Sequence, residues 1–146
     1  MSGYIWLISI LMWLALEDIQ SCRLKNRTLL LFSILGVIAA GVRWGIYGEI
    51  TNFVDFAALG LLLGIMQKIS KGQIGTGDIW VLAGLPLYIE ETAMWESIWV
   101  SLLLMAVTAI ITYAEERNKK AGIPYIPFLC AGVIITMWRN FANGFY

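Results

Sequence analysis

LLLFSILGVIAAGVRWGIYG, residues 29–48, is a run of 20 residues with one charged side chain, Arg43. A helical crossing of a bilayer needs about 20 mostly apolar residues, so this run is long enough to span a membrane. Five further apolar stretches accompany it, at residues 3–16, 53–66, 79–89, 94–114 and 123–138. The pattern predicts an all-α fold with about six transmembrane helices, in one integral membrane domain over residues 1–146.

The composition of the chain agrees with a membrane protein. It is 60% hydrophobic and 14% charged, whereas soluble domains contain roughly 25% charged residues. Ten basic and ten acidic residues cancel, and no basic block indicates binding to nucleic acid. The lipid bilayer is therefore the surrounding we expect. No Lys or Arg precedes the first stretch, which we interpret as a retained span and not as a cleavable signal peptide.

The basic residues predict the orientation of the spans. If all six stretches cross, Arg43 and Arg139 fall on one face and the other eight basic residues on the opposite face. Short loops rich in Lys and Arg stay in the cytoplasm, so both termini are predicted to lie outside. The eight residues on the predicted cytoplasmic face are Arg23, Lys25, Arg27, Lys68, Lys71, Arg117, Lys119 and Lys120.

The fourth stretch, residues 79–89, is the weakest candidate for a span. Its length and its Gly-rich approach also allow a partial or re-entrant helix. Without this crossing, however, the basic cluster at residues 117–120 would be exported. We therefore predict six crossings, with the fourth helix starting late because of Gly75 and Gly77.

The residue types restrict the chemistry. The chain has no histidine, and its two cysteines, Cys22 and Cys130, form no CxxC pair. This leaves no ligand set for zinc or haem and no imidazole for a Ser-His-Asp or Cys-His site. We predict no metal and no cofactor, and we expect acid and base catalysis to depend on Asp and Glu.

Two carboxylates stand out by their position. The predicted topology puts Asp18 and Asp78 at the cytoplasmic ends of two helices, whereas most other acidic residues fall in loops or at the outer boundary. Carboxylates that share a proton can divide the work of an aspartic protease, one activating water and the other polarising a carbonyl. Helix capping and interfacial hydration are the alternative explanations for both residues.

The residues before Asp78 are Gly75, Thr76 and Gly77. Glycine permits backbone conformations and close approaches that a Cβ atom would block, so an extended substrate could lie against this segment. The same residues could simply end a loop before a helix, with Asp78 as its N-cap.

Gly75-Thr76-Gly77-Asp78 resembles the GxGD motif of membrane aspartic proteases, a group that includes the prepilin and preflagellin peptidases. The segment from Asp18 to Asn26 is similar to the prepilin peptidase pattern of an Asp followed, after five variable residues, by Ile-Pro-Asn. Ile123-Pro124-Tyr125-Ile126-Pro127-Phe128-Leu129 resembles the Ile-Pro-Phe-x-Pro-Phe segment that begins the last helix of the family. Lys25 stands where the family has proline, and Trp80 stands where bacterial relatives often have lysine.

The resemblance implies a membrane endopeptidase at the cytoplasmic face of the cell membrane, with Asp18 and Asp78 as the catalytic pair. Its partner would be a pilin-like or flagellin-like precursor with a short basic leader and a transmembrane N-terminal helix. Gly75, Gly77, Asn26, Pro124 and Pro127 would shape the active site. The chain lacks the cysteine-paired insertion of longer members between the first two spans, so the resemblance implies no N-methyltransferase activity.

Two readings from other functional classes remain open. In a small proton- or cation-coupled transporter, Asp18, Asp55 and Asp78 would bind the ion, although such carboxylates are expected near the middle of spans. In a non-enzymatic assembly protein, Gly60 and Gly64 would form a GxxxG pattern for close helix packing.

Overall fold

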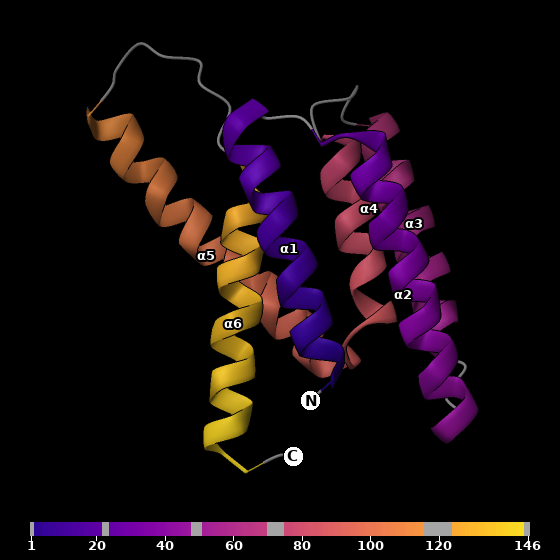
Figure 1. Ribbon diagram of the computed structural model, residues 1–146. Helices are drawn as coiled ribbons and strands as arrows, with labels where there is room; N and C mark the ends of the chain where they lie inside the picture. Colours follow the sequence, from indigo (N-terminus) through magenta and orange to yellow (C-terminus); the bar gives the residue numbers. More distant parts are fainter. Residues whose placement is uncertain (1, 22–23, 48–50, 70–74, 116–123, 145–146) are drawn as a thin grey trace. The chain divides into compact units, whose positions relative to one another are not determined.

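The computed structural model describes residues 2–21, 24–47, 51–69, 75–115 and 124–144. Within these ranges the chain forms six α-helices and one short 3₁₀ helix, and Figure 1 shows their course. The prediction of an all-α fold is confirmed. The helices form two compact units, Leu24–Glu91 and a second that combines Met1–Arg23 with Thr92–Tyr146.

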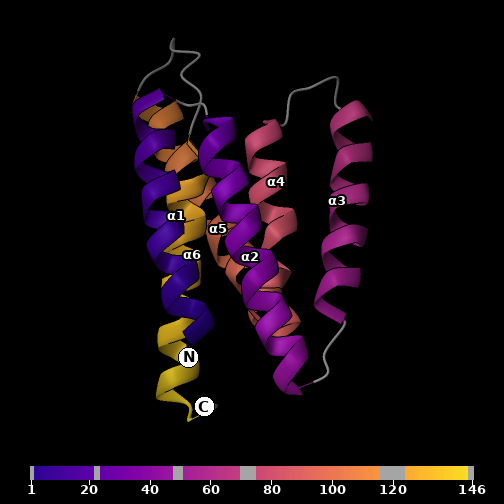
Figure 2. The ribbon, with the colours of Figure 1, turned by 45° about the vertical axis from the view of Figure 1, so that its right-hand side comes forward.

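The Leu24–Glu91 unit contains α2 (Asn26–Tyr47), α3 (Thr51–Ile69), α4 (Thr76–Gly84) and the 3₁₀ helix η1 (Leu85–Leu87). Figure 2 shows α4 beside both α2 and α3, and α4 contacts each of them. Ile79, Val81 and all residues from 83 to 89 are buried. The stretch with the weakest signal for a membrane span is therefore the core of this unit.

The ends of α4 differ from the prediction. The helix begins at Thr76, not at the first apolar residue Ile79, because Thr76, Gly77 and Asp78 form its first turn. It ends at Gly84, where the chain tightens into η1. Pro86 explains this end, since proline has no N–H to donate to the carbonyl of Leu82 one turn earlier.

Glycines allow α2 and the α4–η1 segment to approach closely. A Cβ atom on Gly36 would lie 2.9 Å from the ring of Tyr88, and one on Gly84 would overlap the ring of Phe32. The rings of Phe32 and Tyr88 pack with their centroids 5.0 Å apart. The Tyr88 hydroxyl donates a hydrogen bond to the backbone carbonyl of Phe32, which ties the residue after η1 to the N-terminal half of α2.

Arg43 ties the same segment to a second point of α2. Its guanidinium Nη2 donates hydrogen bonds of 3.0 and 2.7 Å to the carbonyl oxygens of Pro86 and Leu87. The last carbonyls of a helical segment have no partner within it and must be satisfied elsewhere. Arg43, the single charged residue of the apolar run 29–48, therefore caps a buried helix end.

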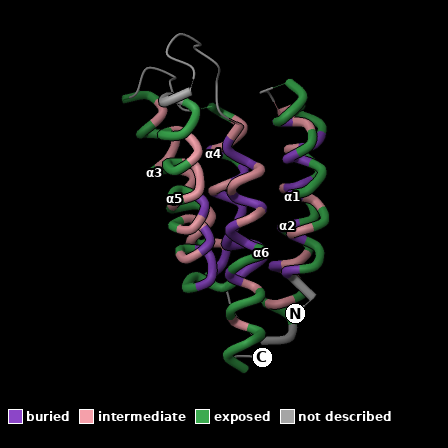
Figure 3. Tube along the Cα trace, turned by 90° about the vertical axis from the view of Figure 1, so that its left-hand side faces the viewer, coloured by how far each residue is buried: buried purple, intermediate pink, exposed green. Residues whose placement is uncertain are grey.

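The second unit contains α1 (Ser2–Ser21), α5 (Glu91–Glu115) and α6 (Ile126–Ala142). α1 packs along α6. On α1, buried residues recur at every third or fourth position and so form a stripe along one helix face. Figure 3 shows the burial, and the stripe consists of Tyr4, Leu7, Leu11, Leu14 and Asp18.

α6 approaches α5 closely at Gly132. A Cβ atom on Gly132 would lie 2.5 Å from the backbone oxygen of Ser97 and 3.2 Å from the backbone nitrogen of Ser101. Small residues on both helices let the backbones approach in this way. Ser97 and Ser101 are fully buried at this crossing.

Four helices of the described chain, α1, α2, α3 and α5, are long and apolar enough to cross a membrane. The other two apolar segments, Thr76–Leu87 and Ile126–Ala142, are shorter. Many large apolar side chains face outward, for example Leu61 on α3 and Ile110 on α5. A soluble protein rarely exposes so much apolar surface, whereas lipid covers it at little cost. The side of the membrane on which the termini lie stays a prediction.

Candidate active site

Asp18 lies on α1, three residues before the helix ends at Ser21. It continues the buried stripe of α1, and its side chain is 6% exposed. The sequence predicted it at the end of a span, and the structure adds that it faces the interior of its unit. Carboxylates are rarely buried unless they have partners, so its surroundings decide what it can do.

The partners of Asp18 are backbone amides at the start of α6. The N–H of Ile126 donates a hydrogen bond of 3.1 Å to Asp18 Oδ2, and the N–H of Tyr125 is a second donor to this carboxyl group. The first N–H groups of a helix have no partner within it and carry the positive end of the helix dipole. Asp18 thus occupies an anion-binding position, and Pro127 in the first turn presets the helical conformation there.

Asp78 lies in the first turn of α4 and is half-buried. A Cβ atom on Gly75 would lie 3.0 Å from Asp78 Oδ2, so the carboxylate folds back over the residue that precedes the helix. Gly75 has an extended backbone with φ −62° and ψ 131°, which any residue can adopt. Glycine is needed here for space and not for an unusual backbone conformation.

Gly77 packs against Leu24. A Cβ atom on Gly77 would lie 2.9 Å from Leu24 Cδ1 and 3.1 Å from Leu24 Cβ. The GxGD segment therefore rests on a residue of the segment that follows Asp18 in the sequence. Gly77 itself lies inside the first turn of α4, so the interpretation of these glycines as the end of a loop holds for Gly75 alone.

The start of α2 forms without the proline that the family resemblance leads one to expect. The carbonyl of Lys25 accepts hydrogen bonds from the N–H groups of Thr28 and Leu29, at 3.0 and 3.1 Å. The helix then begins at Asn26, whose side chain is exposed. Lys25 thus supports an ordinary helix start, and Asn26 is the first residue of α2, in the same unit as Asp78.

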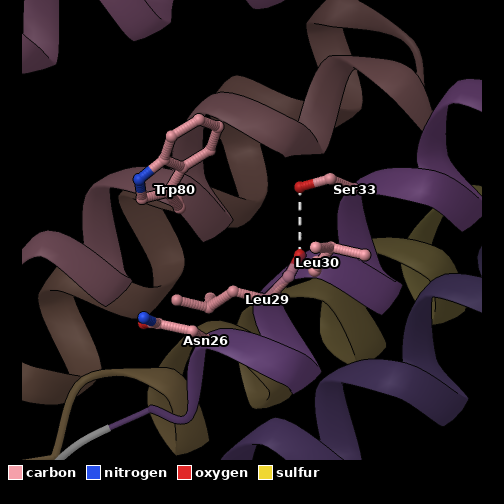
Figure 4. A pocket seen from close by; sticks show the side chains of 5 residues that line it. All are labelled: Asn26, Leu29, Leu30, Ser33 and Trp80. Carbon is pink, nitrogen blue, oxygen red and sulfur yellow. Dashed lines mark hydrogen bonds between the residues drawn. The ribbon is translucent and has the colours of Figure 1, made fainter.

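A groove of about 420 Å³ lies between α2 and α4. Figure 4 shows its lining residues, Asn26, Leu29, Leu30, Ser33 and Trp80. The hydroxyl of Ser33 donates to the carbonyl of Leu29 at 3.0 Å, so the side-chain amide of Asn26 is the main polar group that the lining offers. Trp80 also borders a second groove of about 240 Å³ between α3 and α4, with Gly60 and Ala83 on its walls.

The predicted site residues fall into two groups. Asp18, Pro124 and Pro127 belong to the unit that contains α1 and α6, whereas Asn26, Gly75, Gly77 and Asp78 belong to the Leu24–Glu91 unit. That Asp18 and Asp78 meet stays a prediction. Among the described residues no three His, Cys, Asp or Glu side chains form a group that could hold a metal ion.

Sequence reasoning missed three residues of these surroundings. Tyr125 lies within the motif at residues 123–129, and its backbone N–H faces Asp18. Leu24, inside the Asp18–Asn26 segment, fills the space in front of Gly77. Ser101 lies within the apolar stretch at residues 94–114, and its hydroxyl contacts that of Tyr125. Cys22 and Ile123 lie outside the described residues.

The resemblance to the prepilin peptidases is confirmed by comparison with known families. The family model of the type IV leader peptidases matches residues 5–114, a range that includes Asp18, Asn26, Gly75, Gly77 and Asp78. Pro124 and Pro127 lie beyond the matched range. No curated protein and no solved structure matches the chain. The match covers about three quarters of the 146 residues, and the chain belongs to the type IV leader peptidase family.

Proposed function

We propose that this membrane protein is an aspartic endopeptidase that removes the basic leader from pilin-like or flagellin-like precursors. The observation that carries the proposal is the family match, because it includes both aspartates of the predicted pair. The burial of Asp18 against the start of α6 also supports it. A carboxylate without a function usually lies at the surface, whereas buried carboxylates with specific partners are concentrated at functional sites.

In the proposed reaction Asp18 and Asp78 share one proton. The ionised carboxylate takes a proton from water as the water oxygen attacks the carbonyl carbon of the scissile peptide bond, and the protonated carboxyl donates to the carbonyl oxygen. The tetrahedral intermediate then collapses, the C–N bond breaks, and the leaving amine receives a proton from the pair. The two residues titrate as one system.

The groove beside Asp78 supports a substrate with an apolar helix. Trp80 is two residues after Asp78 on α4, so it lies about 3 Å further along the helix axis and about 200° around it, and the groove it lines is at nearly the same level as the carboxylate. We propose that the apolar segment after the scissile bond lies along Leu29, Leu30 and Trp80. Asn26, Gly75 and Gly77 would then contact the substrate backbone near the cut, and Pro124 and Pro127 would shape the start of α6.

The orientation of the site follows from the charge distribution. Lys25 directly precedes α2 and Lys68 lies in the last turn of α3, and basic residues of short loops stay in the cytoplasm. We therefore propose that the site faces the cytoplasm, where the basic leader of the precursor would emerge. α1 ends at Ser21 and α2 begins at Asn26. This short connection supports a peptidase without methyltransferase activity.

The test is co-expression with a tagged precursor and detection of leader removal by gel mobility. We expect cleavage by the wild type and none by Asp18→Asn or Asp78→Asn, each checked for insertion into the membrane. Asp55→Asn is the matched control, because it removes the third aspartate of the chain and should cleave normally. Cleavage by either variant of the pair would contradict the mechanism, and loss of function in all three variants would favour an ion-binding role.

A further inference from the structure

Two buried hydroxyl groups join α5 to the start of α6. Ser101 Oγ and the Tyr125 hydroxyl oxygen lie 2.9 Å apart. Ser101 is fully buried and Tyr125 is 8% exposed. A buried hydroxyl costs free energy unless it is hydrogen-bonded, and the bond between these two groups holds Tyr125 at a fixed place on α5.

The protons of this pair can be assigned. The Ser101 hydroxyl donates to the carbonyl of Ile98 at 2.7 Å. A serine hydroxyl has one proton, so in its contact with Tyr125 it can only accept. The tyrosine hydroxyl is therefore the donor, and the bond runs from Tyr125, the residue just before α6, to Ser101 on α5.

The backbone of the same tyrosine faces the proposed catalytic aspartate. The N–H groups of Tyr125 and Ile126 both donate to Asp18. Gly132, less than two turns further along α6, is the second point at which α6 is held against α5. The direction of the amides that hold Asp18 thus depends on where α5 holds the first turns of α6.

We infer that Tyr125 and Ser101 are positioning residues for Asp18, acting through the backbone amides at the start of α6. The inference rests on the proposed function, in which Asp18 is catalytic. Neither hydroxyl needs to touch the substrate. A small error in the place of a catalytic group lowers the rate of the chemical step while leaving the binding of the substrate intact.

The kinetic test uses the purified full chain in lipid nanodiscs and a synthetic precursor with a basic leader, Gly before the scissile bond and an apolar helix. For Tyr125→Phe and Ser101→Ala we expect kcat to fall about 3- to 10-fold, the effect of one lost hydrogen bond, with unchanged KM. The double variant should show about the loss of one single variant, because the two groups act as one unit.

Ser97→Ala is the matched control. Ser97 is fully buried on the same helix, one turn before Ser101, and also lies against Gly132, but its hydroxyl bonds to the carbonyl of Ala93 within α5. We expect its kcat to equal that of the wild type. An equal loss in Ser97→Ala, or a wild-type kcat in Tyr125→Phe, would overturn the inference.

A second measurement is independent of catalysis. The chain has three aspartates, Asp18, Asp55 and Asp78, so labelling Asp side-chain carboxyls with ¹³C gives few NMR signals, and Asp18→Asn identifies that of Asp18. We expect this signal to move in Tyr125→Phe and to stay in place in Ser97→Ala. If the wild type does not cleave the precursor, the proposed function fails, and this signal still decides the inference. A stationary Asp18 signal in Tyr125→Phe would refute the positioning role.

Discussion

Gly77 lies against Leu24, with room for a hydrogen atom but not for a methyl group between them. A Cβ atom on Gly77 would come within 2.9 Å of Leu24 Cδ1. The two residues belong to the two sequence segments that each contain one of the proposed catalytic aspartates. This contact therefore sets the distance between the start of α4 and the chain just before α2.

Gly77→Ala should disturb this contact. The added methyl group must displace Leu24 or the first turn of α4, and overpacking of this kind costs about 1–3 kcal/mol of the free energy of unfolding. We expect a lower melting temperature and lower peptidase activity. The control is Gly77→Ala with Leu24→Ala, which removes the side chain that clashes. Recovery of activity in the double variant would show that the contact is responsible, and no recovery would speak against it.

Arg43→Met should destabilise the Leu24–Glu91 unit. Methionine keeps an apolar stem but leaves the carbonyls of Pro86 and Leu87 without their donor, at a cost of about 1–3 kcal/mol. The other arginine on the same predicted face, Arg139, forms an exposed ion pair with Glu96, and such pairs contribute little to stability. In thermal unfolding in detergent, Arg43→Met should lower the melting temperature and Arg139→Met should leave it nearly unchanged. An equal effect of the two substitutions would contradict the prediction.

Two glycines in helices should respond in opposite ways to alanine. A Cβ atom on Gly132 would meet the backbone of Ser97, whereas one on Gly64 would meet no atom within 4 Å. Gly132→Ala should therefore lower the melting temperature. Gly64→Ala should leave it unchanged or raise it, because alanine favours a helix over glycine by up to about 1 kcal/mol. Destabilisation by Gly64→Ala would instead indicate that the Gly60–Gly64 pattern contacts another chain.

Trp80→Ala should weaken binding of the precursor. Trp80 is 51% exposed and lines both grooves beside α4. Truncating an aromatic contact residue commonly costs more than 1 kcal/mol, so we expect KM to rise at least about fivefold. Trp99 on α5 is 65% exposed and lines neither groove, which makes Trp99→Ala the control. Equal KM values for the two variants would show that the grooves do not receive the substrate.

The helices could be predicted because each apolar run is long and interrupted by polar connections, but their ends could not. Hydropathy ends the first stretch at residue 16, whereas α1 continues through Asp18 to Ser21. It starts the fourth stretch at Ile79, whereas α4 begins at Thr76. Hydropathy records where apolar side chains stop. Backbone hydrogen bonds continue through polar residues that are compatible with a helix.

The burial of Asp18 had a signal in the sequence. Leu7, Leu11, Leu14 and Asp18 follow one another at intervals of four, three and four residues, which places them on one helix face. The contacts of Tyr125 and Leu24 had no such signal. They depend on which helices pack together, and a hydrophobic pattern within one helix does not specify its neighbour.

The stripe on α1 also fixes the phase of Asp18 about the helix axis. With 3.6 residues per turn, inserting a single residue between Leu14 and Asp18 would rotate the carboxylate by about 100° away from the leucines. Asp18 would then leave the amides of Tyr125 and Ile126, although every nearby side chain would still be present. The number of residues between Leu14 and Asp18 is therefore as important for the position of the carboxylate as the presence of the aspartate itself.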